Sequence, residues 1–172
     1  MRLFYAVFLP ENVREALALA QEKVRPYRGW KATRPDQLHV TLMFLGEVDE
    51  TRLPQLKQVG EEAAAGVASF TARLRGTGFF PERGSPRVWF AKAEGAGFGP
   101  LAARLRQALP EFAGAQSFKA HVTLARRKGP VPRPKPLVLD LAFQVHEACL
   151  VHSELSSSGP TYQVLERFPL AG

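Results

Sequence analysis

The sequence has a single cysteine and no long apolar segment. Cys149 is the only cysteine among 172 residues, so no disulfide can form within the chain. A reducing cytosol is compatible with a lone cysteine but does not follow from it. We expect a cytoplasmic protein. No run approaches the ~18 apolar residues of a membrane span. The apolar run at residues 3–9 lacks the small-residue cleavage pattern of a signal peptide, so we expect a first strand there and no membrane association.

The usual motifs of cofactor and metal sites are also missing. Neither a Walker loop nor a GxGxxG motif occurs, so ATP and NAD binding are not indicated. Neither CxxC nor HExxH occurs. The four histidines (His39, His121, His146 and His152) could in principle gather around zinc, but a zinc site needs three or four ligands at suitable spacing. We therefore expect no metal and no cofactor.

Acidic residues are outnumbered by basic ones. The net charge is +7, and sixteen of the 23 basic residues are arginines. The planar guanidinium fork suits phosphate, and excess positive charge favours polyanions such as nucleic acid. The alternative is that the charge serves only solubility.

One four-residue string occurs twice in the chain. His39-Val40-Thr41-Leu42 is repeated as residues 121–124, and both copies lie in runs typical of strands. Side chains two apart on a strand share a face, about 6.5–7 Å apart. Each copy should therefore present a His and a Thr on one face and bury a Val and a Leu on the other.

The length predicts a single domain over residues 1–172, and the apolar patterns predict both helices and strands in it. A helix should begin at Pro10, a second at Asp49 or Thr51, and a third should carry Leu101 and Leu105. Strands are expected at residues 2–9, 38–45, 70–80, 87–93, 119–125 and 161–168, with one or two more within 137–151. We expect the 70–80 strand at the edge of the fold, a basic loop at 128–136 and a hairpin loop at 154–160.

The order of elements suggests an internal duplication. His39 follows Val7 by 32 residues and His121 follows Phe90 by 31, with a helix between strand and motif each time. Such a repeat predicts two similar lobes related by a pseudo-two-fold axis. The two motif strands should then face each other across a cleft.

Two opposed histidines can divide acid and base chemistry between them. An unperturbed imidazole has a pKa of about 6.5 and can give or take a proton near neutral pH. A neutral His can take a proton from the attacking water, while a protonated His gives one to the leaving oxygen. Such a pair suits the cleavage of a phosphodiester and needs no metal. Arg126 and Arg127 follow the second motif and could stabilise the developing charge. A single His-x-Thr is more often structural, and the repetition is what favours catalysis.

The paired motifs resemble the signature of the 2H phosphoesterase superfamily. The bacterial and archaeal branch, known as 2'-5' RNA ligase or RNA 2',3'-cyclic phosphodiesterase, is similar at the start (residues 2–7) and at the end (residues 153–165) as well. The resemblance implies a bilobal α+β fold, with antiparallel sheets lining a central cleft and helices outside. It also implies metal-independent hydrolysis of a 2',3'-cyclic phosphate at an RNA end to a 2'-phosphate. ATP-independent 2'-5' ligation would be the reverse reaction.

The resemblance also implies roles for individual residues. His39 would protonate the leaving 3'-oxygen and His121 would activate water, while Thr41 and Thr123 would hold phosphate oxygens.

Two residues at equal offsets after the motifs complete the implied site. Phe44 would stack on the terminal base and Arg126 would contact the phosphate, with Tyr5 a further candidate for a base contact. Strict alternation puts Phe44 and Arg126 on the face opposite the histidines, so a strand end or twist would have to turn them.

The expected partner is RNA with a 2',3'-cyclic phosphate end, such as a tRNA fragment, and the expected state is a monomer. Two other functions remain open on the sequence alone. One is a non-catalytic protein that binds RNA ends. The other is a phosphodiesterase acting on a small cyclic nucleotide or a 2'-5' oligoadenylate.

Overall fold

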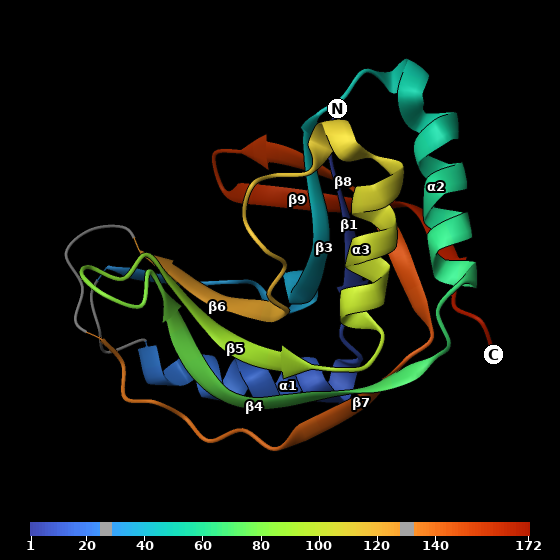
Figure 1. The fold of residues 1–172 in the computed structure, drawn as a ribbon. Coiled ribbons are helices and arrows are strands. Elements are labelled where there is room, and N and C mark those ends of the chain that lie inside the picture. The colour runs from blue at the N-terminus through green and yellow to red at the C-terminus, as the bar shows by residue number, and fades with distance from the viewer. Residues whose placement is uncertain (25–28, 128–132) are drawn as a thin grey trace.

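The computed structural model describes residues 1–24, 29–127 and 133–172, and within these ranges it is built mainly of antiparallel strands (Figure 1). The strands are β1 (Arg2–Phe8), β2 (Trp30–Ala32), β3 (His39–Glu47), β4 (Phe70–Phe80), β5 (Val88–Glu94), β6 (His121–Arg127), β7 (Leu141–Val145), β8 (Glu147–Ser156) and β9 (Gly159–Pro169). The α-helices are α1 (Glu11–Gln21), α2 (Leu53–Ala65) and α3 (Phe98–Ala108). Four 3-10 turns accompany them: η1 (Glu22–Val24), η2 (Pro35–Gln37), η3 (Glu50–Arg52) and η4 (Pro110–Phe112).

The strands form one curved sheet with a narrow seam at its middle. The order is β7-β4-β5-β6-β3-β1-β8-β9, with β2 added to β6. The two motif strands β6 and β3 are the central neighbours, and their recorded register is the pair Val40 and Val122. Four strands of this order lie on each side of the seam, and β2 extends the side of β6, so the two lobes are halves of one sheet rather than separate sheets.

The two halves are related by a pseudo-two-fold axis. Val7 of β1 pairs with Val40, and Ala91 of β5 pairs with Val122. The segment β1-α1-β3 therefore repeats as β5-α3-β6. In this repeat Val7 is equivalent to Ala91, one residue after the Phe90 that the spacing suggested. The helices cross over: α1 contacts β6 and β7 of the other half, and α3 contacts β3 (Figure 1).

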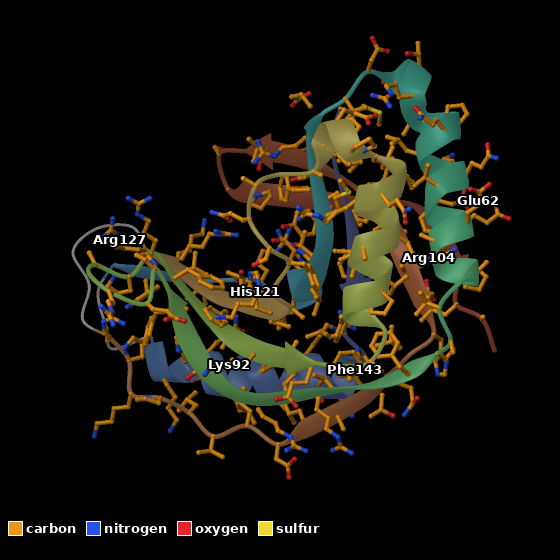
Figure 2. The ribbon with its side chains drawn as sticks, in the orientation of Figure 1. Glu62, Lys92, Arg104, His121, Arg127 and Phe143 are labelled. Carbon is orange, nitrogen blue, oxygen red and sulfur yellow. The ribbon has the colours of Figure 1, made fainter. Side chains whose placement is uncertain are left out.

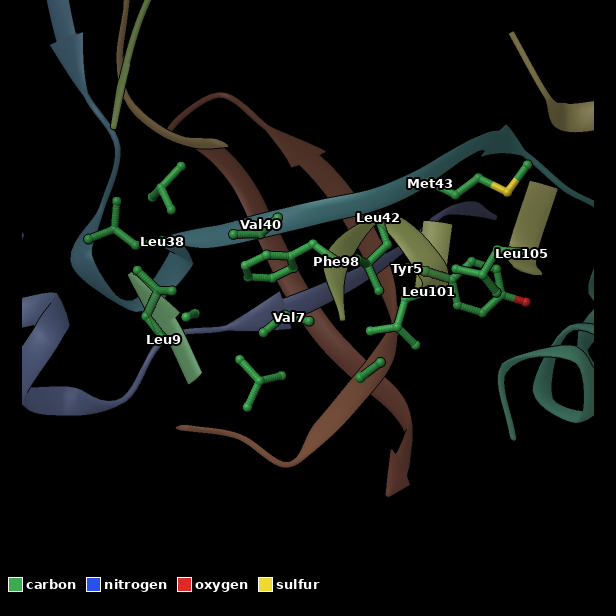
Figure 3. Close-up of a cluster of buried hydrophobic side chains, with 14 of the residues drawn as sticks. Tyr5, Val7, Leu9, Leu38, Val40, Leu42, Met43, Phe98, Leu101 and Leu105 are labelled. Carbon is green, nitrogen blue, oxygen red and sulfur yellow. The ribbon is translucent and has the colours of Figure 1, made fainter. Parts of the chain in front are cut away.

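The main core lies between the sheet and the helices. The motif residues Val40 and Val122 are fully buried in it, and Leu42 and Leu124 are buried beside them. Figure 3 shows Val40 and Leu42 of β3 with Leu101 and Leu105 of α3. Burying a Leu or Val side chain contributes about 1.5–3 kcal/mol. The apolar half of each motif thus holds its strand against the helices and leaves the other face of the strand for His and Thr.

The expected strands and helices are present, with two differences in detail. Residues 70–80 form β4 as predicted, but this strand is not at the edge, because β7 pairs with its first half from Phe70 to Leu74. The hairpin loop expected at 154–160 is shorter than predicted, since β8 runs to Ser156 and β9 starts at Gly159. Much of the basic loop at 128–136 lies outside the described residues. No helix among the described residues is long and apolar enough to cross a membrane.

Candidate active site

The polar half of each motif faces away from the core. His39, Thr41, His121 and Thr123 are each half-buried, while the Val and Leu that alternate with them are buried. Val40 and Val122 are partners in an antiparallel pair, so the register sets His39 beside Thr123 and Thr41 beside His121. Diagonal neighbours across such a pair have Cβ atoms about 7–8 Å apart. The two histidines are diagonal neighbours, a spacing that can bracket one phosphate.

Each motif strand is interrupted by a bulge at the same place. Thr41 pairs with Ala6 and Met43 with Tyr5, which leaves Leu42 as the extra residue of β3. Thr123 pairs with Phe90 and Ala125 with Trp89, which leaves Leu124 as the extra residue of β6. A bulge of this kind shifts the alternation of a strand by one residue. The residue two places after each bulge therefore returns to the histidine face.

Those returning residues are Phe44 and Arg126. Both side chains are exposed, and Phe44 stacks on Phe4 with ring centroids 5.7 Å apart. Phe4 in turn lies 5.1 Å from the ring of His39. The conflict between strict alternation and the expected positions of Phe44 and Arg126 is thus resolved by a duplicated bulge rather than by a strand end or a twist.

Both imidazoles are oriented by the same local bond. His39 Nδ1 lies 2.7 Å from the carbonyl oxygen of Gln37, and His121 Nδ1 lies 2.7 Å from that of Lys119. A carbonyl only accepts, so each Nδ1 carries the proton and donates it. Each Nε2 is then an acceptor in the neutral ring, and the Thr41 hydroxyl donates to His39 Nε2 over 2.9 Å.

The surroundings favour neutral imidazoles in the free protein. Burial lowers the pKa of His39 to about 4, against the opposing effect of its bond to Gln37, and the charges of His121 and Arg126 lower it further. Burial likewise lowers the pKa of His121, and Arg126 acts in the same direction. The charge of Arg126 thus acts on both histidines.

Comparison with known proteins agrees with this geometry. The sequence profile of the LigT-like phosphoesterases matches residues 7–90, which include the first motif. An RNA 2',3'-cyclic phosphodiesterase of Thermus thermophilus is 54% identical over 181 aligned residues, covering all of this chain and 91% of the relative.

The chain belongs to the LigT-like phosphoesterase family. Solved structures agree with the assignment. A crystal structure of a Thermus thermophilus protein, also 54% identical, has a TM-score of 0.95 and covers 100% of this chain and 99% of its own. The structure of E. coli LigT complexed with 3'-AMP is 29% identical in sequence, with a TM-score of 0.84. The match covers 99% of this chain and 98% of the LigT chain. The α+β class with its curved antiparallel sheet, predicted from the motifs, is that of this family.

Aromatic rings surround each histidine of this phosphoesterase, and the sequence did not point to most of them. Phe8 and Tyr162 have ring centroids 5.8 Å and 5.6 Å from that of His39. Phe80 and Phe90 take similar positions near His121, at 5.0 Å and 5.4 Å. These aromatic residues lie on strands next to the motif strands. The sequence could have identified them only if the order of the strands had been known.

The two halves differ at the residue opposite each histidine. Phe8 lies opposite His39, whereas Lys92 lies opposite His121 (Figure 2). Arg127, which the sequence offered beside Arg126, is at the other end of β6 from His121 and donates to the Ser85 hydroxyl. The strand position opposite the histidine thus carries a cation in the half with His121 and an aromatic ring in the half with His39.

Tyr5 does not belong to the site. Its side chain is buried in the main core on the opposite face of β1, and its hydroxyl donates to the carbonyl oxygen of Leu56 over 2.6 Å. Burial raises the pKa of its phenol above the usual range. The expectation of a base contact is therefore corrected: neighbours on one strand alternate, so Phe4 faces the site and Tyr5 faces the core.

A buried glutamine supports the second bulge. Gln21 of α1 donates to the carbonyl oxygens of Leu124, over 2.9 Å, and Thr33, over 2.7 Å. The N–H of Thr33 donates to the same Leu124 oxygen over 2.9 Å. These bonds satisfy the carbonyl that the bulge displaces. Gln21 lies four residues after Leu17, and a polar residue on the apolar stripe of a helix was the signal that could have identified it.

The remaining candidates lie apart from the site. His152 is opposite the core residue Leu3 in the pairing of β8 with β1. Its Nδ1 lies 4.0 Å from Oε1 of Glu154. Burial raises the pKa of the Cys149 thiol to about 12, which fits an unreactive thiol. Among the residues described, no three His, Cys, Asp or Glu side chains gather as metal ligands would.

Proposed function

We propose that this protein hydrolyses 2',3'-cyclic phosphates at RNA ends to 2'-phosphates. The observation that carries the proposal is the adjacency of β3 and β6, with both His-x-Thr pairs on one face and both Nδ1 atoms bound to carbonyl oxygens. Relatives named RNA 2',3'-cyclic phosphodiesterase support the substrate, and a net charge of +7 fits an RNA partner.

The reaction needs one proton taken and one proton given. His121 Nε2 takes a proton from water as the water oxygen attacks phosphorus. The bond between phosphorus and the 3'-oxygen breaks, and His39 gives its Nε2 proton to that oxygen. The phosphate stays on the 2'-oxygen. The hydroxyls of Thr41 and Thr123 donate to the non-bridging oxygens, and Arg126 stabilises the charge that develops on them.

The acid role of His39 requires that substrate binding change its protonation. With a pKa of about 4, His39 is neutral in the free protein at pH 7. A bound phosphate anion favours the imidazolium and raises that pKa. Once Nε2 carries a proton it no longer accepts from Thr41, whose hydroxyl becomes free to donate to the phosphate.

The same groups can also catalyse a transesterification and its reverse, with an RNA hydroxyl in place of water. The 3'-hydroxyl of one RNA strand would attack a 2'-5' phosphodiester and expel a 5'-hydroxyl, and the opposite direction joins a cyclic-phosphate end to a 5'-hydroxyl without ATP. Water is far more abundant than RNA ends, so hydrolysis is the main reaction. We further expect a cytoplasmic monomer that acts on RNA ends such as those of tRNA fragments.

Replacing the two histidines tests the proposal. His39→Ala and His121→Ala should each lower kcat/KM by about 10²–10⁴-fold on a cyclic-phosphate oligonucleotide in the presence of EDTA, as expected when a general acid or base is lost. His152→Ala is the matched control, since His152 lies on the core side of β8. Full rate in either of the first two variants would contradict the proposal, and so would loss of turnover in EDTA alone.

A further inference from the structure

A cavity lies beside His39 and shares two aromatic residues with its surroundings. Its volume is about 370 Å³, and it is lined by Phe8, Leu9, Arg14, Arg34, Asp36, Gln37, Thr161, Tyr162, Val164 and Arg167. Phe8 and Tyr162 also contact the ring of His39. One layer of side chains therefore separates the cavity from the proposed acid, and the volume falls within the range of small-ligand pockets.

The cavity is rich in arginine, and one arginine has no partner among the described residues. Arg34 is paired with Asp36 at 3.0 Å, and Arg167 with Glu147 at 3.0 Å. The side chain of Arg14, by contrast, makes no hydrogen bond or ion pair with any residue in the described part of the chain, and its Nε is buried. A buried donor normally has a partner. Such an unpaired guanidinium in a cavity wall suits an anionic ligand.

The rest of the wall is aromatic and aliphatic. Phe8 and Tyr162 supply rings, and Leu9 and Val164 supply aliphatic surface. Stacking on such rings is the usual way in which proteins hold single-stranded bases. An anion joined to a planar ring, as in a nucleotide, matches both parts of the cavity.

We propose that this cavity binds the nucleotide that precedes the cyclic end of the RNA. The inference rests on the proposed function. Along β3 the cavity residues before His39 and the ring of Phe44 lie on opposite sides of the His-x-Thr pair. The base and the 5'-carbon leave opposite ends of a ribose whose 2' and 3' oxygens carry the cyclic phosphate. With the terminal base on Phe44, the 5' phosphate therefore points toward Arg14.

The enzyme is accordingly selective for chains over single nucleotides. A mononucleotide fills the space between the histidines and leaves the cavity empty. A dinucleotide places its internal phosphate near Arg14 and its first base against Phe8 or Tyr162. The cavity thus makes an oligonucleotide end, rather than a small cyclic nucleotide, the preferred substrate.

The test compares adenosine 2',3'-cyclic phosphate with the dinucleotide ApA ending in the same group. In the wild type, kcat/KM should be at least about tenfold higher for the dinucleotide, as one stacked base and one phosphate contact predict. Arg14→Gln should bring the ratio of the two values toward one. Thr161→Glu places a negative charge at the exposed rim, leaves the core untouched and should lower the same ratio. Arg104→Gln on α3 is the matched control and should keep the wild-type ratio.

Two results would overturn the inference while leaving the proposed function intact. One is equal hydrolysis of both substrates by the wild type. The other is a loss in Arg14→Gln and Thr161→Glu that is the same for both substrates. If neither substrate is hydrolysed, the proposed function fails. Whether the cavity binds a nucleotide is then tested separately by measuring binding affinities. Calorimetry with adenosine 2'-phosphate and with ApA 2'-phosphate should then show tighter dinucleotide binding that Arg14→Gln removes, and equal affinities would reject it.

Discussion

Phe44 of β3 and Arg126 of β6 occupy equivalent positions, each two residues past the same bulge, yet one is a ring and the other a cation. The backbone of the site is therefore nearly symmetric, whereas its chemistry is not. A cyclic phosphate nucleotide is itself asymmetric, with a base at one end. We therefore expect the substrate to bind in one orientation and His39 and His121 to have separate roles.

The exposed ring of Phe44 should contribute through stacking. The side chain is 51% exposed, so a base can cover it without displacing the core. Phe44→Ala should raise KM and lower kcat/KM by roughly 5–100-fold, the range for loss of one stacked base. Phe44→Tyr keeps the ring and should remain near the wild-type value. Steady-state rates on adenosine 2',3'-cyclic phosphate would measure both, and an unchanged KM in Phe44→Ala would argue against stacking.

The charge of Arg126 should contribute to the pH dependence of the enzyme. Burial is the main cause of the lowered pKa of both histidines, and Arg126 lowers both further. The bell-shaped profile of kcat/KM should therefore be centred below pH 6.5, and Arg126→Ala should move both limbs to higher pH while lowering the maximum. Arg126→Lys keeps the charge and should leave the limbs in place. Arg127→Ala, at the end of the strand, is the control, and a profile in Arg126→Ala identical in shape to that of the wild type would contradict the account.

His39 should make the fold less stable in acid. Its pKa is about 4 in the folded protein and about 6.5 when unfolded. Between these values the unfolded chain binds a proton that the folded chain does not, so the free energy of unfolding falls as the pH is lowered from about 6.5 toward 4. His39→Gln removes the contribution of this imidazole to the pH dependence of the free energy of unfolding. Urea unfolding at several pH values should show a shallower decline in His39→Gln, and parallel curves would refute the assignment.

Cys149 should be inert in the folded protein. Its thiol is buried with a pKa of about 12, so about one molecule in 10⁴ is a thiolate at pH 8. In the unfolded chain, with a pKa near 8.5, roughly a quarter would be ionised. Labelling by a thiol reagent at pH 8 should therefore be slow without denaturant and complete within minutes in guanidinium chloride. Rapid labelling of the native protein would contradict this expectation and show that the packing around Cys149 opens.

The sequence was sufficient for the motif and its faces, because period-two alternation and an exact repeat are local signals. His39, Thr41 and the buried Val40 lie where alternation puts them. The sequence was also sufficient to pair the two halves, since the repeated order of strand, helix and motif strand predicts equivalent positions.

What escaped the sequence depends on contacts between distant strands. The bulges at Leu42 and Leu124 arise from pairing with β1 and β5, so alternation alone placed Phe44 and Arg126 on the wrong face. The assignment of Tyr5 failed for a related reason, since nothing local distinguishes the core side of a wholly apolar strand from the other side. Tyr162 became a neighbour of His39 only through the sheet order, which places β9 near the motif from 123 residues away.

The crossing of the helices has a consequence for how RNA reaches the site. Helix α1 leaves β1 and packs on β6 and β7, while α3 leaves β5 and packs on β3. A movement that pulled the two motif strands apart would strip both helices of their apolar contacts at once, which a domain of marginal stability does not tolerate. We therefore expect the spacing between the two imidazoles to stay fixed when substrate binds, so that an RNA end has to adapt to it from the face of the sheet that carries both histidines.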